Sequence, residues 1–120
     1  MAVVIMCDNP AQLLAEIKLG IRQGTVTSWV VDTDGDFTLA DGQWSQRAWL
    51  RPTTAEGRLI LKIIGPQSQR MSKATYAVYH SRFIETLLRD FDLKFSQAWA
   101  TALATPGEYV GQPAPVKAAP

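Results

Sequence analysis

The pattern of hydrophobic and polar positions predicts an amphipathic helix near the start of the chain. Its apolar residues recur at three- and four-residue spacing, at Leu13, Leu14, Ile17 and Ile21. This spacing places them on one side of a helix over residues 10–23. Asn9 can accept from the unpaired N–H groups of the first turn, Pro10 suits the first helical position, and Gly24 suits the end.

A second, longer amphipathic helix is predicted after residue 72. A wide apolar stripe runs along it, at Tyr76, Tyr79, His80, Phe83, Ile84, Leu87, Leu88 and Phe91. Ser72 is in position to cap this helix, and Met71 and Tyr76 have the spacing of a hydrophobic staple. The width of the stripe predicts that this helix is the main helical contribution to the core.

Between the helices, short apolar runs separated by turn residues predict an antiparallel meander of three or four strands. The predicted strands cover residues 25–32, Phe37 to Leu39, 44–51 and 58–64. Asp34 and Gly35 are the residue types of a two-residue hairpin turn, in which both central positions need positive φ. Residues 52–57 are predicted to turn the third strand into the fourth.

These elements predict a two-layer α+β domain, in which a helix, the meander and a long helix follow one another. Both helices are expected to cover the same face of the sheet. One globular domain is expected over residues 1–104, because single domains cluster at about 100 to 150 residues. Residues 105–120 contain four of the seven prolines and are predicted to form a disordered tail.

Strand alternation predicts which side chains lie on the face that the helices leave bare, because residues two apart point the same way. The predicted core-facing residues are Val30, Phe37, Leu39, Trp44, Ala48, Leu50, Leu59, Leu61 and Ile63. The predicted outer face carries Trp29, Val31, Trp49 and Ile60 among the bases Arg47, Arg51, Arg58 and Lys62. Such a face indicates a binding surface, because a tryptophan left in water forfeits roughly 1.5 to 3 kcal/mol that burial supplies.

Three occupants of this face fit the sequence. They are a second copy of the chain, the segment from Leu93 to Leu103 folding back, and a ligand with negative charge and a flat ring. The structure of residues 93–104 is ambiguous, since Phe95 and Trp99 have helical spacing whereas Leu93 and Phe95 also alternate as in a strand.

The order of charges along the chain adds to this prediction. Residues 1–42 hold six acids against two bases, residues 43–82 hold seven bases against one acid, and the remainder is nearly balanced. The formal net charge of +1 therefore hides a basic middle segment. Such a segment could attract an anionic ligand, a protein partner or a nucleic acid backbone.

The sequence predicts a cytoplasmic protein that does not enter membranes. The apolar run from Ala2 to Cys7 lacks a basic flank and is followed by Asp8, so it does not fit a signal peptide. No run approaches the roughly 20 apolar residues that cross a bilayer. Cys7 is the single cysteine, so no internal disulfide can form and a reducing compartment is expected.

The candidates for metal binding and catalysis do not complete a known site. A calcium loop beginning at Asp32 and including Asp34 and Asp36 would need Gly and Glu where the chain has Phe37 and Gln43. Turn chemistry accounts for these aspartates. No metal ligand and no cofactor are therefore predicted.

His80 is the only histidine and lies on the apolar stripe of the second helix, which favours a buried structural role. Cys7 has no local signature of a Cys–His pair. An enzyme that uses His80 with Asp32 or Asp36 stays an alternative, with a reachable His80 in a concave pocket as its requirement. No catalytic residue is assigned.

A nucleic-acid role is a further alternative. The order of helix, three strands and helix resembles that of a double-stranded RNA-binding domain, and Gly65, Ser68, Arg70 and Lys73 loosely resemble its strand-to-helix junction. The bases are sparse there, and the pI of about 7.9 lies below the basic range of such domains. The sequence therefore favours a non-catalytic interaction module, acting as a homodimer or with a protein partner, whose contact is the outer face of the sheet.

Overall fold

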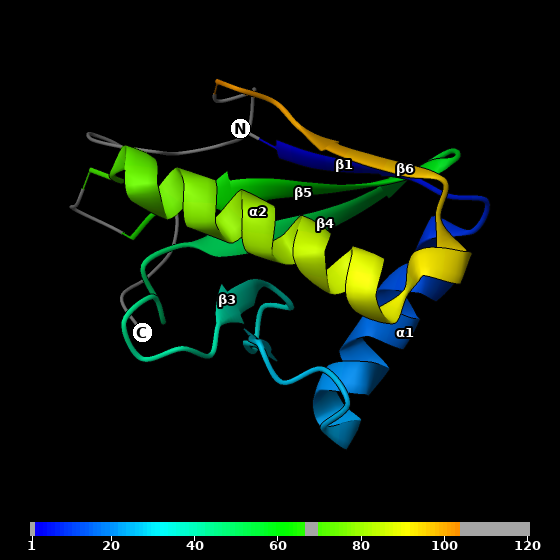
Figure 1. The fold of residues 1–120 in the computed structure, drawn as a ribbon, viewed down its shortest axis with the longest axis horizontal. Helices are drawn as coiled ribbons and strands as arrows, with labels where there is room; N and C mark the ends of the chain where they lie inside the picture. The colour runs from blue at the N-terminus through cyan, green and yellow to red at the C-terminus, as the bar shows by residue number, and fades with distance from the viewer. Residues whose placement is uncertain (1, 67–69, 104–120) are drawn as a thin grey trace.

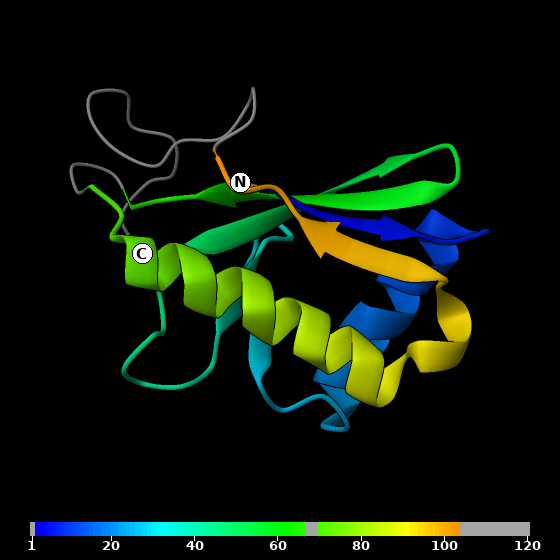
Figure 2. The same ribbon diagram turned by 45° about the horizontal axis from the view of Figure 1, so that its top comes forward.

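The computed structural model describes residues 2–66 and 70–103, which form an α+β fold with a six-stranded antiparallel sheet and two helices. The elements in chain order are β1 (Ala2–Met6), α1 (Pro10–Gln23), β2 (Trp29–Val31), β3 (Phe37–Leu39), β4 (Trp49–Ala55), β5 (Arg58–Ile64), α2 (Lys73–Asp90), the short 3-10 helix η1 (Asp92–Lys94) and β6 (Gln97–Ala100). The strands are ordered β2-β3-β4-β5-β1-β6 (Figure 1). Both helices lie on one side of the sheet (Figure 2), as the sequence predicted.

The ends of both long helices follow the local sequence. The side chain of Asn9 accepts from the N–H of Gln12 at 3.1 Å, and Gly24 ends α1 in the left-handed conformation with a φ of 83°. The Ser72 hydroxyl accepts from the N–H of Thr75 at 3.1 Å at the start of α2. The predicted starts of both helices and the end of α1 are therefore confirmed.

The opening apolar run forms β1, a strand that the prediction of a three- or four-stranded meander lacked. It lies between β5 and β6, and its Val3 and Ile5 are fully buried. Its partners are distant in the chain, since Val3 pairs with Leu61 on one side and with Ala100 on the other. No short turn connects β1 to either partner strand, so the sequence pattern identified this segment only as apolar.

The ambiguous segment after α2 forms η1 and then β6, at the edge of the sheet. The N–H of Ser96 donates to the carbonyl of Met6, and the N–H of Thr101 donates to the carbonyl of Ala2, both at 2.9 Å. The segment thus extends the sheet instead of folding back over its outer face. The predicted tail at 105–120 lies outside the described residues.

The hairpin between β2 and β3 has a longer turn than predicted. The N–H of Gly35 donates to the carbonyl of Asp32, and the N–H of Asp32 donates to the carbonyl of Asp36. Residues 33–35 therefore form a three-residue turn between the bonded residues Asp32 and Asp36. Gly35 adopts the left-handed conformation in this turn, with a φ of 85°. Trp29 consequently pairs with Leu39, whereas the two-residue turn had paired Val30 with that leucine.

The third predicted strand begins later and runs further than expected. Residues 43–47 form turns, and β4 continues through Pro52 to Ala55. Pro52 pairs with Leu61, whose backbone is bonded to β1, so this position needs no hydrogen-bond donor. The fourth predicted strand is confirmed as β5, with Leu59, Leu61 and Ile63 fully buried.

One hydrophobic core lies between the helices and the sheet. Its largest contributors are Leu13 and Ile17 of α1, Tyr79, Phe83 and Leu87 of α2, and inward-facing residues of the strands, among them Ile5, Trp29, Phe37, Leu50, Leu61 and Ile63. This core covers one face of the sheet, and the opposite face is left without a helix.

Candidate binding surface

The register of the strands defines the face that carries no helix, called here the outer face. Its side chains alternate with the core-facing ones: Ala2, Val4 and Met6 of β1, Trp49, Arg51, Thr53 and Ala55 of β4, Arg58, Ile60, Lys62 and Ile64 of β5, and Gln97 and Trp99 of β6. Val4 pairs with Trp99 on one side and with Ile60 on the other. The side chains of these three residues therefore form an apolar row across β6, β1 and β5.

Trp99 is the main exposed aromatic of this row, with 43% of its surface exposed. Val4, Ile60 and the neighbouring Met6 are half-buried. Trp99 was not among the predicted site residues, because its spacing from Phe95 matched a helix as well as a strand. Its pairing with Val4 depends on long-range contacts that the sequence does not reveal.

Basic residues flank the apolar row, and no outer-face residue of β1, β4, β5 or β6 is acidic. Arg58 is exposed beside Met6, and Lys62 lies between Ala2 and Arg51. The predicted site residues Arg51, Arg58, Ile60 and Lys62 thus lie together on this face.

Arg51 is held by an aspartate of the neighbouring hairpin. Its Nε and Nη2 atoms donate to the two carboxylate oxygens of Asp36 at 3.1 and 2.8 Å. The Asp36 bond raises the pKa of Arg51, with smaller contributions from the nearby charges of Asp34 and Asp32. This ion pair neutralises one end of the basic surface and fixes the orientation of the guanidinium.

The prediction that Trp29 lies on the outer face is wrong. Its side chain is buried in the core, where its Nε1 donates to the Thr86 hydroxyl at 3.0 Å. Its ring also contacts Tyr79 and Phe83 edge to face. The longer hairpin turn moves the pairing by one residue, and a shift of one residue exchanges the two faces of a strand.

Trp49 and Arg47 also differ from the predicted surface. Trp49 points to the outer side, opposite Ile64, but only 2% of its surface is exposed. It is therefore not the exposed anchor that the sequence predicted. Arg47 is exposed, but it lies in the turns that precede β4 and not in a paired strand.

The three aspartates of the first hairpin serve the turn. The Oδ1 atom of Asp32 accepts from the N–H groups of Asp34 and Asp36 at 2.9 and 3.0 Å. The carboxylates come within 4.8 Å of one another, and Asp36 is bonded by Arg51. Their proximity is explained by turn geometry and an ion pair, so we assign no metal site to them.

His80 and Cys7 do not form an accessible reactive site. Only 3% of the His80 surface is exposed, and its Nδ1 lies 2.7 Å from the carbonyl oxygen of Tyr76. Cys7 is buried, and its burial raises the pKa of the thiol and disfavours the reactive thiolate. The enzyme hypothesis required a reachable His80, which this arrangement does not supply.

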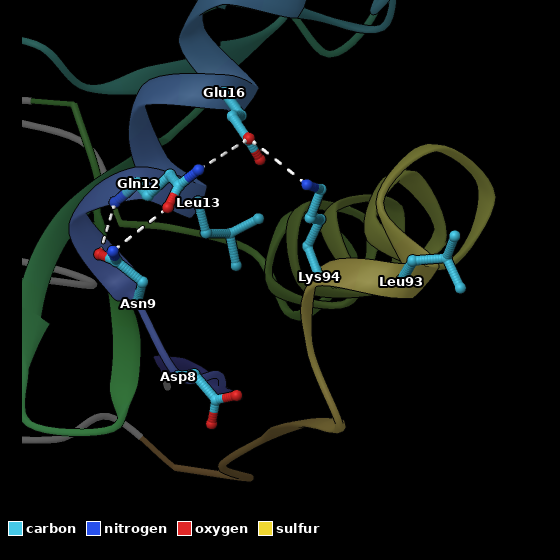
Figure 3. A pocket seen from close by; sticks show the side chains of 7 residues that line it. All are labelled: Asp8, Asn9, Gln12, Leu13, Glu16, Leu93 and Lys94. Atoms are coloured by element: carbon cyan, nitrogen blue, oxygen red, sulfur yellow. Dashed lines mark hydrogen bonds and ion pairs between the residues drawn. The ribbon is translucent and has the colours of Figure 1, made fainter.

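A shallow groove lies between α1 and the segment that follows α2 (Figure 3). Asp8, Glu16 and Lys94 provide its charged groups, and Lys94 forms an ion pair with Glu16 at 3.6 Å. Its volume is about 200 Å³, below the roughly 300 to 1,000 Å³ of typical small-molecule sites. The groove is therefore a weaker candidate for a binding site than the outer face.

The completed topology also removes the similarity to a double-stranded RNA-binding domain. Four strands lie between α1 and α2, β1 precedes α1, and β6 follows α2. Ser68 of the suggested junction lies outside the described residues. The order of helix, three strands and helix was the basis of that similarity, and it is not the order of this fold.

Comparisons of the chain with family models, with curated proteins and with solved structures found no match of any kind. Among the described helices, none combines the length and the apolar composition that crossing a membrane requires. Any function therefore has to come from the geometry and chemistry of the chain itself.

Proposed function

We propose that this protein is a non-catalytic interaction module, which binds an acidic segment of a protein partner across the outer face. The observation that carries the proposal is the apolar row of Trp99, Val4 and Ile60, which is flanked by the basic residues Arg58 and Lys62. An exposed apolar row gains free energy when a partner covers it. Basic residues beside the row favour an acidic partner and speed its approach.

Charge argues against a homodimer in which two outer faces pack together. Such a dimer would bring Arg58 and Lys62 of both copies into one interface, and no acidic residue of β1, β4, β5 or β6 lies on the outer face to separate them. Opposed like charges in an interface are costly. An acidic partner removes this cost, so it fits the face better than a second outer face does.

The aromatic content of the face argues for protein over single-stranded nucleic acid. Proteins that bind single strands stack successive bases on several exposed aromatic side chains. Among the described residues of this face, only Trp99 is an exposed aromatic, since Trp49 is buried. A single tryptophan between aliphatic residues is better suited to a partner's apolar side chain.

A displayed library of random twelve-residue peptides tests the proposal. Selected peptides should carry Asp or Glu next to an aromatic or large aliphatic residue. In fluorescence anisotropy with the selected peptides, both Arg58→Glu and Trp99→Ala should weaken binding at least tenfold. Binding should also weaken with added salt, because the charged groups lie at an exposed rim.

Arg22→Glu is the matched control, since Arg22 is an exposed base in the last turn of α1, away from the outer face. It should leave peptide binding unchanged. Equal affinities for the wild type, Arg58→Glu and Trp99→Ala would overturn the proposal. So would a single-stranded RNA oligonucleotide that outcompetes every selected peptide in an Arg58-dependent manner.

A further inference from the structure

Among the described residues, no strand pairs with the outer edge of β6, which carries backbone groups that are able to pair with another strand. The N–H of Cys7 donates to the carbonyl of Gly57, and the N–H of Thr101 donates to the carbonyl of Ala2. Along a strand of an antiparallel sheet, the backbone groups of successive residues point alternately to the two neighbouring strands. In β1, the odd-numbered residues therefore bond to β5 and the even-numbered residues bond to β6. The N–H and C=O groups of Ala98 and Ala100 therefore point away from β1, toward the open edge.

The other open edges among the described residues are protected against pairing. β2 has three residues and is followed directly by Asp32. β4 pairs with β3 only at Leu50, and its remaining edge carries Pro52, which has no N–H to offer. In contrast, β6 has the sequence Gln-Ala-Trp-Ala, without charge, proline or glycine. It is the edge that lacks the usual protection.

The helix layer beside this edge offers two apolar residues, Ile84 and Leu88. α2 packs against β1 and β6 on the face of the sheet that the helices cover (Figure 2). Thr86 on one flank of α2 bonds Trp29 of β2, which places Ile84 on the opposite flank, toward β6. Leu88 lies one turn beyond Ile84, and 59% of its surface is exposed.

We propose that β6 pairs edge to edge with β6 of a second copy, across a two-fold axis at Trp99. Ala98 of one copy then bonds to Ala100 of the other, and the two Trp99 side chains face each other between the hydrogen-bonded pairs. The two sheets become continuous, and the α2 helices of the two copies lie side by side with Leu88 between them. This contact is isologous, so it closes as a dimer and does not extend into a filament.

Charge and area favour a second copy at this edge. Unlike a dimer of outer faces, edge pairing leaves Arg58 and Lys62 two strands away from the axis in each copy. The residues of β6 carry no charge to oppose. Two short strands alone are too small for a stable dimer, which buries about 1,200 Å² or more, so the contribution of α2 through Leu88 is required.

The solution mass tests the dimer. At concentrations of tens of micromolar, light scattering should give twice the chain mass of 13.2 kDa. Ala100→Pro removes the outward N–H, and Leu88→Glu places a charge between the helices, so each should reduce the mass to that of one chain. Ala100→Ser keeps the N–H and should leave the dimer intact. A wild-type mass of one chain, or a dimer that survives both disruptive changes, would refute the inference.

A cross-link tests the register and covers the case in which Ala100→Pro fails to fold. In a Cys7→Ala background, Trp99→Cys places the two thiols directly opposite each other, within disulfide reach. Gln97→Cys is the matched control, because its two copies lie on opposite sides of the axis. Oxidation should join the Trp99→Cys chains and leave the Gln97→Cys chains separate. Equal cross-linking of the two variants would exclude this register.

The edge dimer and the acidic partner share Trp99 but are separable through other groups, because the dimer depends on the backbone of β6 and on Leu88, whereas the acidic partner depends on Arg58. Arg58→Glu should weaken peptide binding without changing the mass. Ala100→Pro should halve the mass and leave peptide binding per chain unchanged. A failure of one proposal therefore leaves the other open to its own test.

Discussion

Gly35 has a φ of 85° in the turn between β2 and β3, a conformation that is strained for a β-branched residue. Gly35→Val should therefore lower the free energy of unfolding by about 1 to 3 kcal/mol. Asp34→Asn should change it by less than about 0.5 kcal/mol, because Asp34 is exposed and its backbone N–H makes the bond to Asp32. Urea unfolding measures both. Equal losses would assign a role to the Asp34 side chain itself.

The sequence places Trp49 on the outer face, from which one would expect Trp49→Glu to dissociate an assembly formed through that face and to leave the monomer folded. Because its side chain is buried, Trp49→Glu should instead destabilise the monomer by at least the roughly 1.5 to 3 kcal/mol of lost apolar burial. The carboxylate adds its own desolvation cost. In protein dilute enough to be monomeric, Trp99→Glu, at an exposed site on the same face, is the control and should change the denaturation midpoint little. The opposite order of effects would restore the sequence-based prediction.

The Cys7 thiol should be unreactive in the folded protein and should make stability depend on alkaline pH. Burial raises the pKa of this thiol above that of the unfolded chain. The contribution of the buried, protonated thiol to the free energy of unfolding is therefore complete below the unfolded pKa of about 8.5. This contribution is lost as the pH rises through the pKa of the folded protein. A thiol reagent at pH 8 should label Cys7 slowly in buffer and rapidly in denaturant. Equal labelling rates would show that the thiol is exposed.

At the scale of elements, α2 is expected to contribute most of the helical stabilisation of the core. Phe83 is fully buried, and its ring contacts Trp29 and Phe37 at centroid distances of 5.2 and 5.4 Å. Phe83→Ala should cost about 3 to 5 kcal/mol, a large part of the roughly 5 to 15 kcal/mol that holds a domain together. Leu88→Ala in dilute protein is the control on the same helix, and its cost should be small. A melting temperature within a degree or two of wild type for Phe83→Ala would place α2 outside the core.

Elements that are specified locally were predictable, and those that depend on distant partners were not. The caps at Asn9 and Ser72 and the apolar spacing along α1 and α2 all lie within a few residues, so the helices could be predicted closely. β5 was also found, because its alternation is continuous from Arg58 to Ile64. β1 and β6 were missed because each is defined by a partner far away in the chain.

At the scale of the whole molecule, β1 connects β5 and β6, two strands that are distant from β1 and from each other in the chain. It lies between β5 and β6 and buries Val3 and Ile5 in the common core. Removal of residues 1–6 should therefore abolish cooperative unfolding of the entire fold, instead of loosening one end. Near-ultraviolet circular dichroism and a thermal melt would detect this. A truncated chain with the native spectrum and a sharp transition would contradict the central position of β1.

The candidate surface shows the same division between local and long-range information. The positions of Arg51, Arg58, Ile60 and Lys62 followed from alternation along β4 and β5, which local sequence specifies. Trp29 was assigned to the wrong face, because the turn has three linking residues and not two, and the resulting shift of one residue reverses the strand. A two-residue turn and a three-residue turn are both compatible with a segment that contains Asp and Gly at these positions. The local sequence therefore does not decide between them.

The sequence by itself determined the two helices with their caps, the strand over Arg58–Ile64, the α+β class and the basic character of the middle segment. Each of these is encoded by neighbouring residues through spacing, capping and charge. Only the tertiary structure decided that residues 2–6 and 97–100 join the sheet, that Trp99 lies beside Val4, and that β6 forms an unprotected edge among the described residues. Strand pairing joins residues that are distant in sequence, and its register depends on turns and contacts that local patterns leave open.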